Sequence, residues 1–218
     1  MEPKTFIFDL DGVIVDTTKY HYLAWKKLVS GMGISFSEEQ NEQLKGVSRV
    51  KSLETILSWS NISVSEDRFM ELMARKNDDY LQYISNMSED EILPGVLDVL
   101  NFLKERRQKI GLGSASKNAR PILSRLGLNV FFDCIVDGTD ISKAKPDPEV
   151  FLKGAELLRS QPSNCIVFED SISGIHAANT AGMISIGLGD SVTLGHADHV
   201  FTSFEEIPSD FIQQLIDS

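Results

Sequence analysis

The pattern of apolar and polar residues divides most of the chain into alternating strands and helices. Five short apolar runs are typical of buried strands. The first ends at Phe8, and the others span 109–113, 134–136, 165–168 and 184–187. Stretches with helical spacing follow these runs or lie between them, at 95–107, 119–126, 148–160 and 172–182. This alternation predicts an α/β fold, a Rossmann-like parallel sheet with helices on both faces.

One long segment interrupts the alternation. Between Thr17 and Met87 the pattern is almost wholly helical, with pieces at 18–30, 38–44, 49–59 and 65–84. We therefore predict a core formed by residues 1–16 and 88–218, with a helical-bundle cap domain inserted at 17–87. From residue 189 onward, no pattern lets us predict an element.

Composition narrows the class of protein. The 218 residues carry a net charge of −11, which argues against binding to nucleic acid or to anionic membranes. No apolar run approaches the roughly 20 residues of a membrane span, and no signal peptide is recognisable at the N-terminus. Cys134 and Cys165 lie in short apolar runs without metal-like spacing, so we expect buried thiols in a reduced, cytoplasmic protein. We also expect a monomer.

Two carboxylates follow the first strand. Asp9 and Asp11 would point the same way if the extended backbone continued past Asp9, and Gly12 lets the chain turn away. The carboxyl edge of such a sheet is where ligands bind. One carboxylate can attack phosphorus while the other transfers a proton to or from the leaving oxygen. Asp-x-Asp-Gly also occurs in calcium loops and plain turns, so the pair alone leaves those alternatives open.

Two later strand ends carry polar groups suited to a phosphate. Residues 113–118, Gly-Ser-Ala-Ser-Lys-Asn, offer hydroxyls and backbone N–H groups before a helix, although Ser116 or Asn118 could simply cap that helix. Lys145 precedes a proline in a loop held near the same edge, although a surface lysine is the simpler alternative.

The end of the predicted strand 165–168 is the fourth such position, and it adds acidic groups. Glu169 and Asp170 would lie beside Asp9 and Asp11, and the four carboxylates would repel one another unless a divalent cation lay among them. Oxygen ligands favour Mg²⁺.

Taken together, these four strand ends resemble the motifs of the haloacid dehalogenase (HAD) superfamily over the whole chain. The resemblance implies Asp9 as nucleophile and Asp11 as acid and base, with Ser114 and Lys145 orienting the phosphoryl group. It also implies Mg²⁺ bound by Asp9, the Asp11 carbonyl and Asp170, with Glu169 in or just outside the ligand shell.

The cap resembles that of the β-phosphoglucomutase family within this superfamily. Residues 45–49, Lys-Gly-Val-Ser-Arg, would hold the phosphate that is not transferred, because Gly46 permits close approach and Arg49 offers a planar fork of donors. Together with the two carboxylates and the segment after strand 109–113, the implied substrate-binding residues are Asp9, Asp11, His21, Trp25, Gly46, Val47, Ser48, Arg49, Ser52, Lys76, Ser114, Ala115, Ser116, Lys117, Asn118 and Lys145.

Simpler structural interpretations remain open for three of these residues. Arg49 could be a solvated residue at a helix start, and His21 could be a satisfied core histidine. Lys76 falls within the apolar stripe of helix 65–84 and needs a partner or ligand there, unless its side chain reaches out to solvent.

The resemblance implies interconversion of β-D-glucose 1-phosphate and β-D-glucose 6-phosphate through β-D-glucose 1,6-bisphosphate and a phospho-aspartyl enzyme, in maltose- or trehalose-type carbohydrate catabolism. A sugar-phosphate phosphatase would use the same core residues and is the main alternative. A catalytically silent sugar-phosphate sensor would not need all four motifs.

Overall fold

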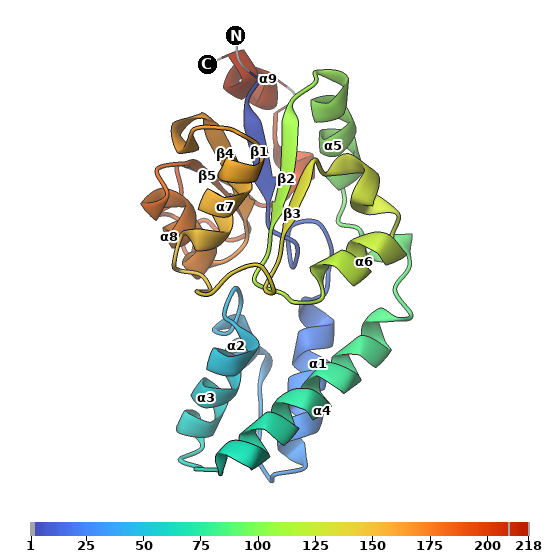
Figure 1. Ribbon diagram of the computed structural model, residues 1–218, viewed down its shortest axis with the longest axis vertical. Helices are drawn as coiled ribbons and strands as arrows, with labels where there is room; N and C mark the ends of the chain where they lie inside the picture. Colours follow the sequence, from blue (N-terminus) through green and yellow to red (C-terminus); the bar gives the residue numbers. More distant parts are fainter. Residues whose placement is uncertain (1–2, 209, 218) are drawn as a thin grey trace.

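The computed structural model describes residues 3–208 and 210–217 and contains one parallel sheet (Figure 1). Its strand order is β3-β2-β1-β4-β5-β6, which places the first strand in the middle. The strands are β1 (Thr5–Phe8), β2 (Lys109–Gly113), β3 (Cys134–Val136), β4 (Cys165–Glu169), β5 (Ile184–Leu188) and β6 (His199–Phe201). The predicted parallel α/β fold is confirmed.

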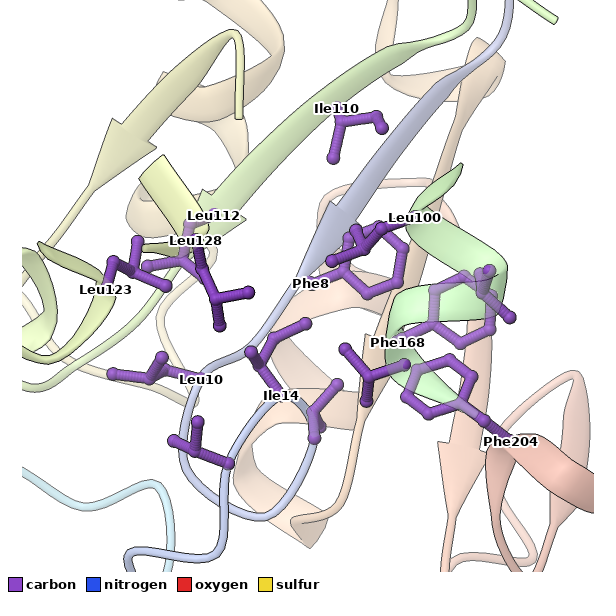
Figure 2. Close-up of a cluster of buried hydrophobic side chains, with 14 of the residues drawn as sticks. Phe8, Leu10, Ile14, Leu100, Ile110, Leu112, Leu123, Leu128, Phe168 and Phe204 are labelled. Atoms are coloured by element: carbon purple, nitrogen blue, oxygen red, sulfur yellow. The ribbon is translucent and has the colours of Figure 1, made fainter. Parts of the chain in front are cut away.

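Helices cover both faces of the sheet. The helices of this part are α5 (Val96–Glu105), α6 (Ala119–Arg125), α7 (Glu149–Leu157), α8 (Ile172–Thr180) and α9 (Phe211–Asp217), with short 3₁₀ helices at Glu89–Glu91, Leu128–Phe131, Pro162–Asn164 and Phe204–Glu206. On one face, Phe8 and Phe168 belong to the larger core together with Leu100 of α5 and Leu123 of α6 (Figure 2). Ile212 of α9 belongs to the same core. On the other, Ile7 and Val167 pack against α7 and α8.

The helices before α5 form a separate group beyond the carboxyl ends of β1 and β2 (Figure 1). They are α1 (Thr18–Ser30), α2 (Glu38–Glu42), α3 (Arg49–Trp59) and α4 (Glu66–Ile84). Ser37, Ser48 and Ser65 cap α2, α3 and α4 by accepting a backbone N–H. Trp25, Leu53 and Leu72 belong to a hydrophobic core that this group forms by itself. The exact domain boundaries remain a prediction, and the predicted core includes residues 1, 2, 209 and 218, which lie outside the described residues.

The predicted and observed elements differ mainly at helix ends and in the last thirty residues. Arg107 and Arg159 adopt a positive φ, of 56° and 51°, just beyond α5 and α7, so these helices end before the predicted positions. Strand β6 and helix α9 are not predicted at all. Cys134 is only half-buried because β3 lies at the sheet edge, whereas Cys165 is buried as expected. Among the described helices, none combines the length and apolar character needed to cross a bilayer.

Candidate active site

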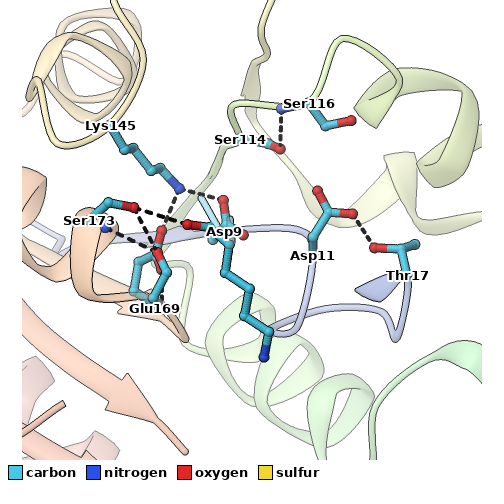
Figure 3. A network of polar contacts seen from close by, with 11 residues as sticks. Asp9, Asp11, Thr17, Ser114, Ser116, Lys145, Glu169 and Ser173 are labelled. Atoms are coloured by element: carbon cyan, nitrogen blue, oxygen red, sulfur yellow. Dashed lines mark hydrogen bonds and ion pairs between the residues drawn. The ribbon is translucent and has the colours of Figure 1, made fainter. Parts of the chain in front are cut away.

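A buried lysine joins two of the predicted strand ends. The Lys145 ammonium, in the loop after β3, donates to the Asp9 carboxylate and to Glu169 Oε1 at 2.5 Å (Figure 3). Lys145 is only 4% exposed, which contradicts the surface-lysine alternative. Burial opposes the charge of Lys145, but the two carboxylates raise its pKa above the ordinary value. Burial also raises the pKa of Asp9, and the charge of Lys145 offsets part of that rise.

Asp11 lies beside the start of α1. Thr17 Oγ1 donates to the Asp11 carboxylate, and His21 Nε2 lies 3.8 Å from the same oxygen. Burial raises the pKa of Asp11, while the bond from Thr17 lowers it. A carboxyl with a raised pKa is suited to donating and accepting a proton near neutral pH. Strand β1 ends at Phe8, before either carboxylate, and a turn with Gly12 at φ 84° follows Asp11.

Lys76 of α4 completes this group. Its side chain is 1% exposed, and Nζ lies 2.9 Å from His21 Nδ1, so it does not reach solvent. The ammonium also lies over the rings of Trp25 and Tyr80, at 5.0 and 4.6 Å from their centroids. Burial lowers the pKa of Lys76 to about 7, and the positive charge of Arg49 adds to this effect. Burial, followed by the charge of Lys76, likewise lowers the pKa of His21 well below its usual range.

The loop between α2 and α3 docks on the start of α8. Lys45 Nζ lies 3.3 Å from Asp170 Oδ2, and Ser173 Oγ donates to the Lys45 carbonyl at 3.3 Å. Gly46 has a φ of 70°, and a β-carbon there would lie only 2.6 Å from Ser171 Oγ. Gly46 therefore permits a close approach, as predicted, but this approach is to the sheet domain itself.

The segment after β2 forms a compact turn. Ser114 is fully buried, and its Oγ accepts from Ser116 N at 3.0 Å (Figure 3). Ser116 Oγ in turn accepts from Asn118 N at 3.2 Å, so this hydroxyl does serve the local backbone. The Asn118 side chain makes no cap and instead donates to Asn77 Oδ1 of α4 at 3.1 Å.

These groups surround a cavity of about 460 Å³ between the sheet edge and the cap helices. Fourteen of the sixteen predicted substrate-binding residues line it, all except Ser114 and Lys145, which lie behind it. Arg49 opens α3 and is half-buried, so it is not a freely solvated residue. Ser48 caps α3, and Ser52 Oγ donates to the Ser48 carbonyl at 3.0 Å, which holds Arg49 at the cavity wall.

Three cations in the cavity wall have no acidic partner. Within the described ranges, no carboxylate forms an ion pair with Arg49, Lys76 or Lys117. Burial lowers the pKa of Arg49, and Tyr80 offsets only part of this effect. Lys117 is exposed, but Arg49 is half-buried and Lys76 is fully buried, so two cations without an ion pair face one cavity in a chain with a net charge of −11, which favours an anionic ligand.

The acidic groups at the sheet edge suit a metal ion, although their full ligand set remains a prediction. Burial and the charge of Glu169 raise the pKa of Asp170 to about 7 despite Lys45, and a divalent cation would relieve this crowding. Glu169 accepts from Lys145, Ser171 N and Ser171 Oγ, which favours a place outside the ligand shell. In the described part of the chain, no three His, Cys, Asp or Glu side chains cluster tightly enough for a metal. A metal site here would therefore need a backbone oxygen, such as the Asp11 carbonyl, as a further ligand.

Sequence reasoning missed three contacts at the site. Lys45, predicted with the rest of 45–49 to hold a phosphate, contacts Asp170. Thr17 contacts Asp11 and Asn77 contacts Asn118, and neither was among the predicted substrate-binding residues. Thr17 stands at the start of the stripe that continues to His21 and Trp25, so its position at a spacing of four carried a usable signal. The other two contacts depend on how the cap docks on the core.

Comparisons with known proteins identify the family of this chain. A family model described as haloacid dehalogenase-like hydrolase matches residues 3–182. A Bacillus subtilis protein named β-phosphoglucomutase is 41% identical over 213 residues, covering 97% of this chain and 94% of the relative. A Thermotoga maritima phosphorylated carbohydrates phosphatase is 32% identical over 197 residues, covering 89% of each chain.

A solved structure shares the whole arrangement. The crystal structure of β-phosphoglucomutase from Clostridium difficile matches with a TM-score of 0.94 and 42% identity, covering 99% of this chain and 97% of that one. The family match, the two relatives and the shared fold lead to one conclusion. The chain belongs to the haloacid dehalogenase-like hydrolase family.

Proposed function

We propose that this protein is a β-phosphoglucomutase that interconverts β-D-glucose 1-phosphate and β-D-glucose 6-phosphate. The observation that carries the proposal is that two unlike groups line one cavity: the acidic pair Asp9 and Asp11, and the cations Arg49 and Lys117, which form no ion pair within the described part of the chain. A phosphatase needs one phosphate site, whereas a mutase needs a second site for the phosphate that is not being transferred. Nearly the full chain is similar to two proteins named β-phosphoglucomutase, which supports the mutase over the phosphatase.

The reaction follows from the positions of the two aspartates. An Asp9 oxygen attacks phosphorus, and Asp11 donates a proton to the leaving sugar oxygen, which gives phospho-Asp9 and a free sugar hydroxyl. The return transfer to the other hydroxyl reverses these roles, after the bisphosphate has turned around in the cavity. Lys145, held between Asp9 and Glu169, compensates negative charge at the reacting phosphoryl group.

Asp9, the Asp11 carbonyl and Asp170 would hold Mg²⁺, with Glu169 beside them. The ion, when bound, neutralises phosphoryl oxygens and draws the acidic side chains together. The cap would limit the access of water to phospho-Asp9, and the contact of Lys45 with Asp170 holds the loop between α2 and α3 against the core beside the cavity.

The deciding experiment is a coupled assay of β-D-glucose 1-phosphate with Mg²⁺ and a trace of β-D-glucose 1,6-bisphosphate, run beside the α-anomer. Phosphate release is measured in the same samples. Formation of glucose 6-phosphate from the β-anomer, in large excess over phosphate release, is the expected result. Stoichiometric phosphate release without the mutase product would instead establish the phosphatase that the Thermotoga maritima relative represents.

The protein's setting is also part of the proposal. Cys134 and Cys165 are both free thiols, in keeping with a reducing cytoplasm, and the ligands would be sugar phosphates bound by a monomer.

A further inference from the structure

Glu149, in the first turn of α7, binds the segment that carries Lys145. Its carboxylate accepts from Ser142 N at 3.0 Å, from Ser142 Oγ at 2.8 Å and from Lys143 N at 2.7 Å. Two consecutive backbone N–H groups and one hydroxyl thus converge on one half-buried carboxylate. Such charge-assisted bonds to backbone are stronger than neutral ones and fix the path of the loop.

The other end of the same segment is held as well. Asp147 N donates to the Ala144 carbonyl at 3.1 Å, and Asp147 Oδ1 accepts from Glu149 N at 3.0 Å. Lys145 therefore lies on a short span with both ends fastened to the start of α7. Its side chain runs from this span to the Asp9 carboxylate and to Glu169, where the ammonium is buried.

We propose that Glu149 is a positioning residue for phosphoryl transfer: it clamps the backbone at Ser142 and Lys143 so that the Lys145 ammonium sits between Asp9 and Glu169. This inference rests on the proposed role of Lys145 in charge compensation. Glu149 itself does not line the cavity, and so it acts only through the loop. A displacement of about 1 Å in a catalytic group can cost on the order of 100-fold in rate.

The Glu149 carboxylate is ionised at every pH at which the protein would work. Hydrogen bonds from Ser142 N and Lys143 N lower the pKa of Glu149 to about 2. Lys153, one turn further along α7, lies 3.7 Å from Glu149 Oε1 and also donates to the Asp140 carbonyl. Removing the carboxylate would leave the two N–H groups to water and release the loop, without removing any group that touches substrate.

A simpler role for Glu149 is general stabilisation, because an acidic residue in the first turn of a helix favours that helix. The two roles differ in what they change. A stabilising residue alters the melting temperature and leaves the rate of the folded protein unchanged. A positioning residue alters the rate of phosphoryl transfer at temperatures where the variant is fully folded.

The test compares Glu149→Ala, Glu149→Gln and the matched control Glu156→Ala, an exposed glutamate on the same helix. The rate of phospho-Asp9 formation is measured with acetyl phosphate and Mg²⁺, well below each melting temperature. We expect Glu149→Ala to lower kcat about 10- to 100-fold with KM changed less than about threefold, as for other residues that orient a catalytic group. Glu149→Gln, which keeps one acceptor oxygen, should recover part of the rate, and Glu156→Ala should match the wild type.

Combination with Lys145→Ala shows whether the effect passes through that lysine. If Glu149 acts by positioning Lys145, then Glu149→Ala costs little further rate in the Lys145→Ala background. Equal losses in both backgrounds, or a Glu149→Ala variant with wild-type kcat and a lower melting temperature, would overturn the inference. If Lys145→Ala does not fold, the comparison of rate with melting temperature for the Glu149 variants decides the question. Mutase turnover by the wild type is measured separately, so a failure of the proposed function can be told apart from a failure of the inference about Glu149.

Discussion

The two walls of the cavity handle charge in opposite ways. On the sheet side, Lys145 is shared between Asp9 and Glu169, so positive and negative groups already compensate one another. On the opposite side, Arg49 and Lys76 have no carboxylate partner in the described part of the chain, and burial lowers the pKa of each. The Lys145 group on the sheet side is therefore compensated without a substrate and leaves only Asp170 for a cation, whereas Arg49 and Lys76 on the cap side are left for an anionic substrate.

This contrast separates the chemistry from the recognition. Groups that break bonds need fixed geometry, and buried pairs and a clamped loop provide it. Groups that hold the distal phosphate must accept either end of a bisphosphate, so their charge is left for the ligand to satisfy. Substitutions on the sheet side should then lower every phosphoryl transfer, while those on the cap side should affect only substrates that have a second phosphate.

The largest effect is expected for Asp9→Asn. An amide is not a nucleophile toward phosphorus, so turnover should fall to background and no phosphoenzyme should form with either acetyl phosphate or a sugar bisphosphate. Quenched-flow measurement of labelled protein tests this result. A phosphoenzyme that still forms in the variant would move the nucleophile to another residue.

Asp11→Asn should follow, with a loss of about 10²–10⁴ in turnover, the usual range for a missing acid or base. Its backbone carbonyl remains, so the proposed Mg²⁺ affinity should change little. Formation and decay of phospho-Asp9 are measured separately by single-turnover kinetics, alongside Mg²⁺ titration by calorimetry. Unchanged rates for both steps would exclude Asp11 from proton transfer.

The sequence predicts the sheet side of the cavity better than the cap side. The sheet side is predictable because Asp9 and Lys145 follow apolar strands and Glu169 ends one, and the ends of parallel strands share one edge. The docking of Lys45 on Asp170 is not, because it joins segments that no local pattern relates.

Helices and strands also differ in how well the sequence predicts them. The left-handed turns at Arg107 and Arg159 carry no glycine to announce them, and β6 is a three-residue edge strand whose His199 is exposed. What sequence reasoning finds are features repeated along one element. What it misses are contacts created when separate elements meet.

Arg49→Ala tests the cap side directly. Loss of charge-assisted bonds worth about 1.5–3 kcal/mol should lower turnover of the sugar bisphosphate roughly 10- to 150-fold. Phosphorylation of Asp9 by acetyl phosphate should change little, because that donor has no distal phosphate. Lys51→Ala is the control, since Lys51 lies on the same helix and pairs only with Glu54 at the surface, at 3.1 Å. Equal losses with both donors would assign Arg49 to the fold.

The smallest effect on turnover, and the one that separates stability from function, is expected for Lys76→Met. Arg49, Asp11, His21 and Tyr80 are charged or titratable groups that face Lys76, and burial lowers the pKa of Lys76 from 10.5 to about 7. Between these two values the unfolded chain binds more protons than the folded one, so this lysine makes wild-type stability rise with pH over that interval.

Below about pH 7, Lys76 is charged in both states, and its burial costs the folded state on the order of several kcal/mol, at about 1.4 kcal/mol per pKa unit. Lys76→Met should therefore be more stable than the wild type at pH 6, and the difference should shrink toward pH 10. Denaturant unfolding at both pH values measures this, and mutase assays of the same samples should show about a tenfold loss, the effect of one weakened hydrogen bond to a ligand. A stability difference that does not change with pH would mean that Lys76 is not a buried charge, whatever its effect on turnover.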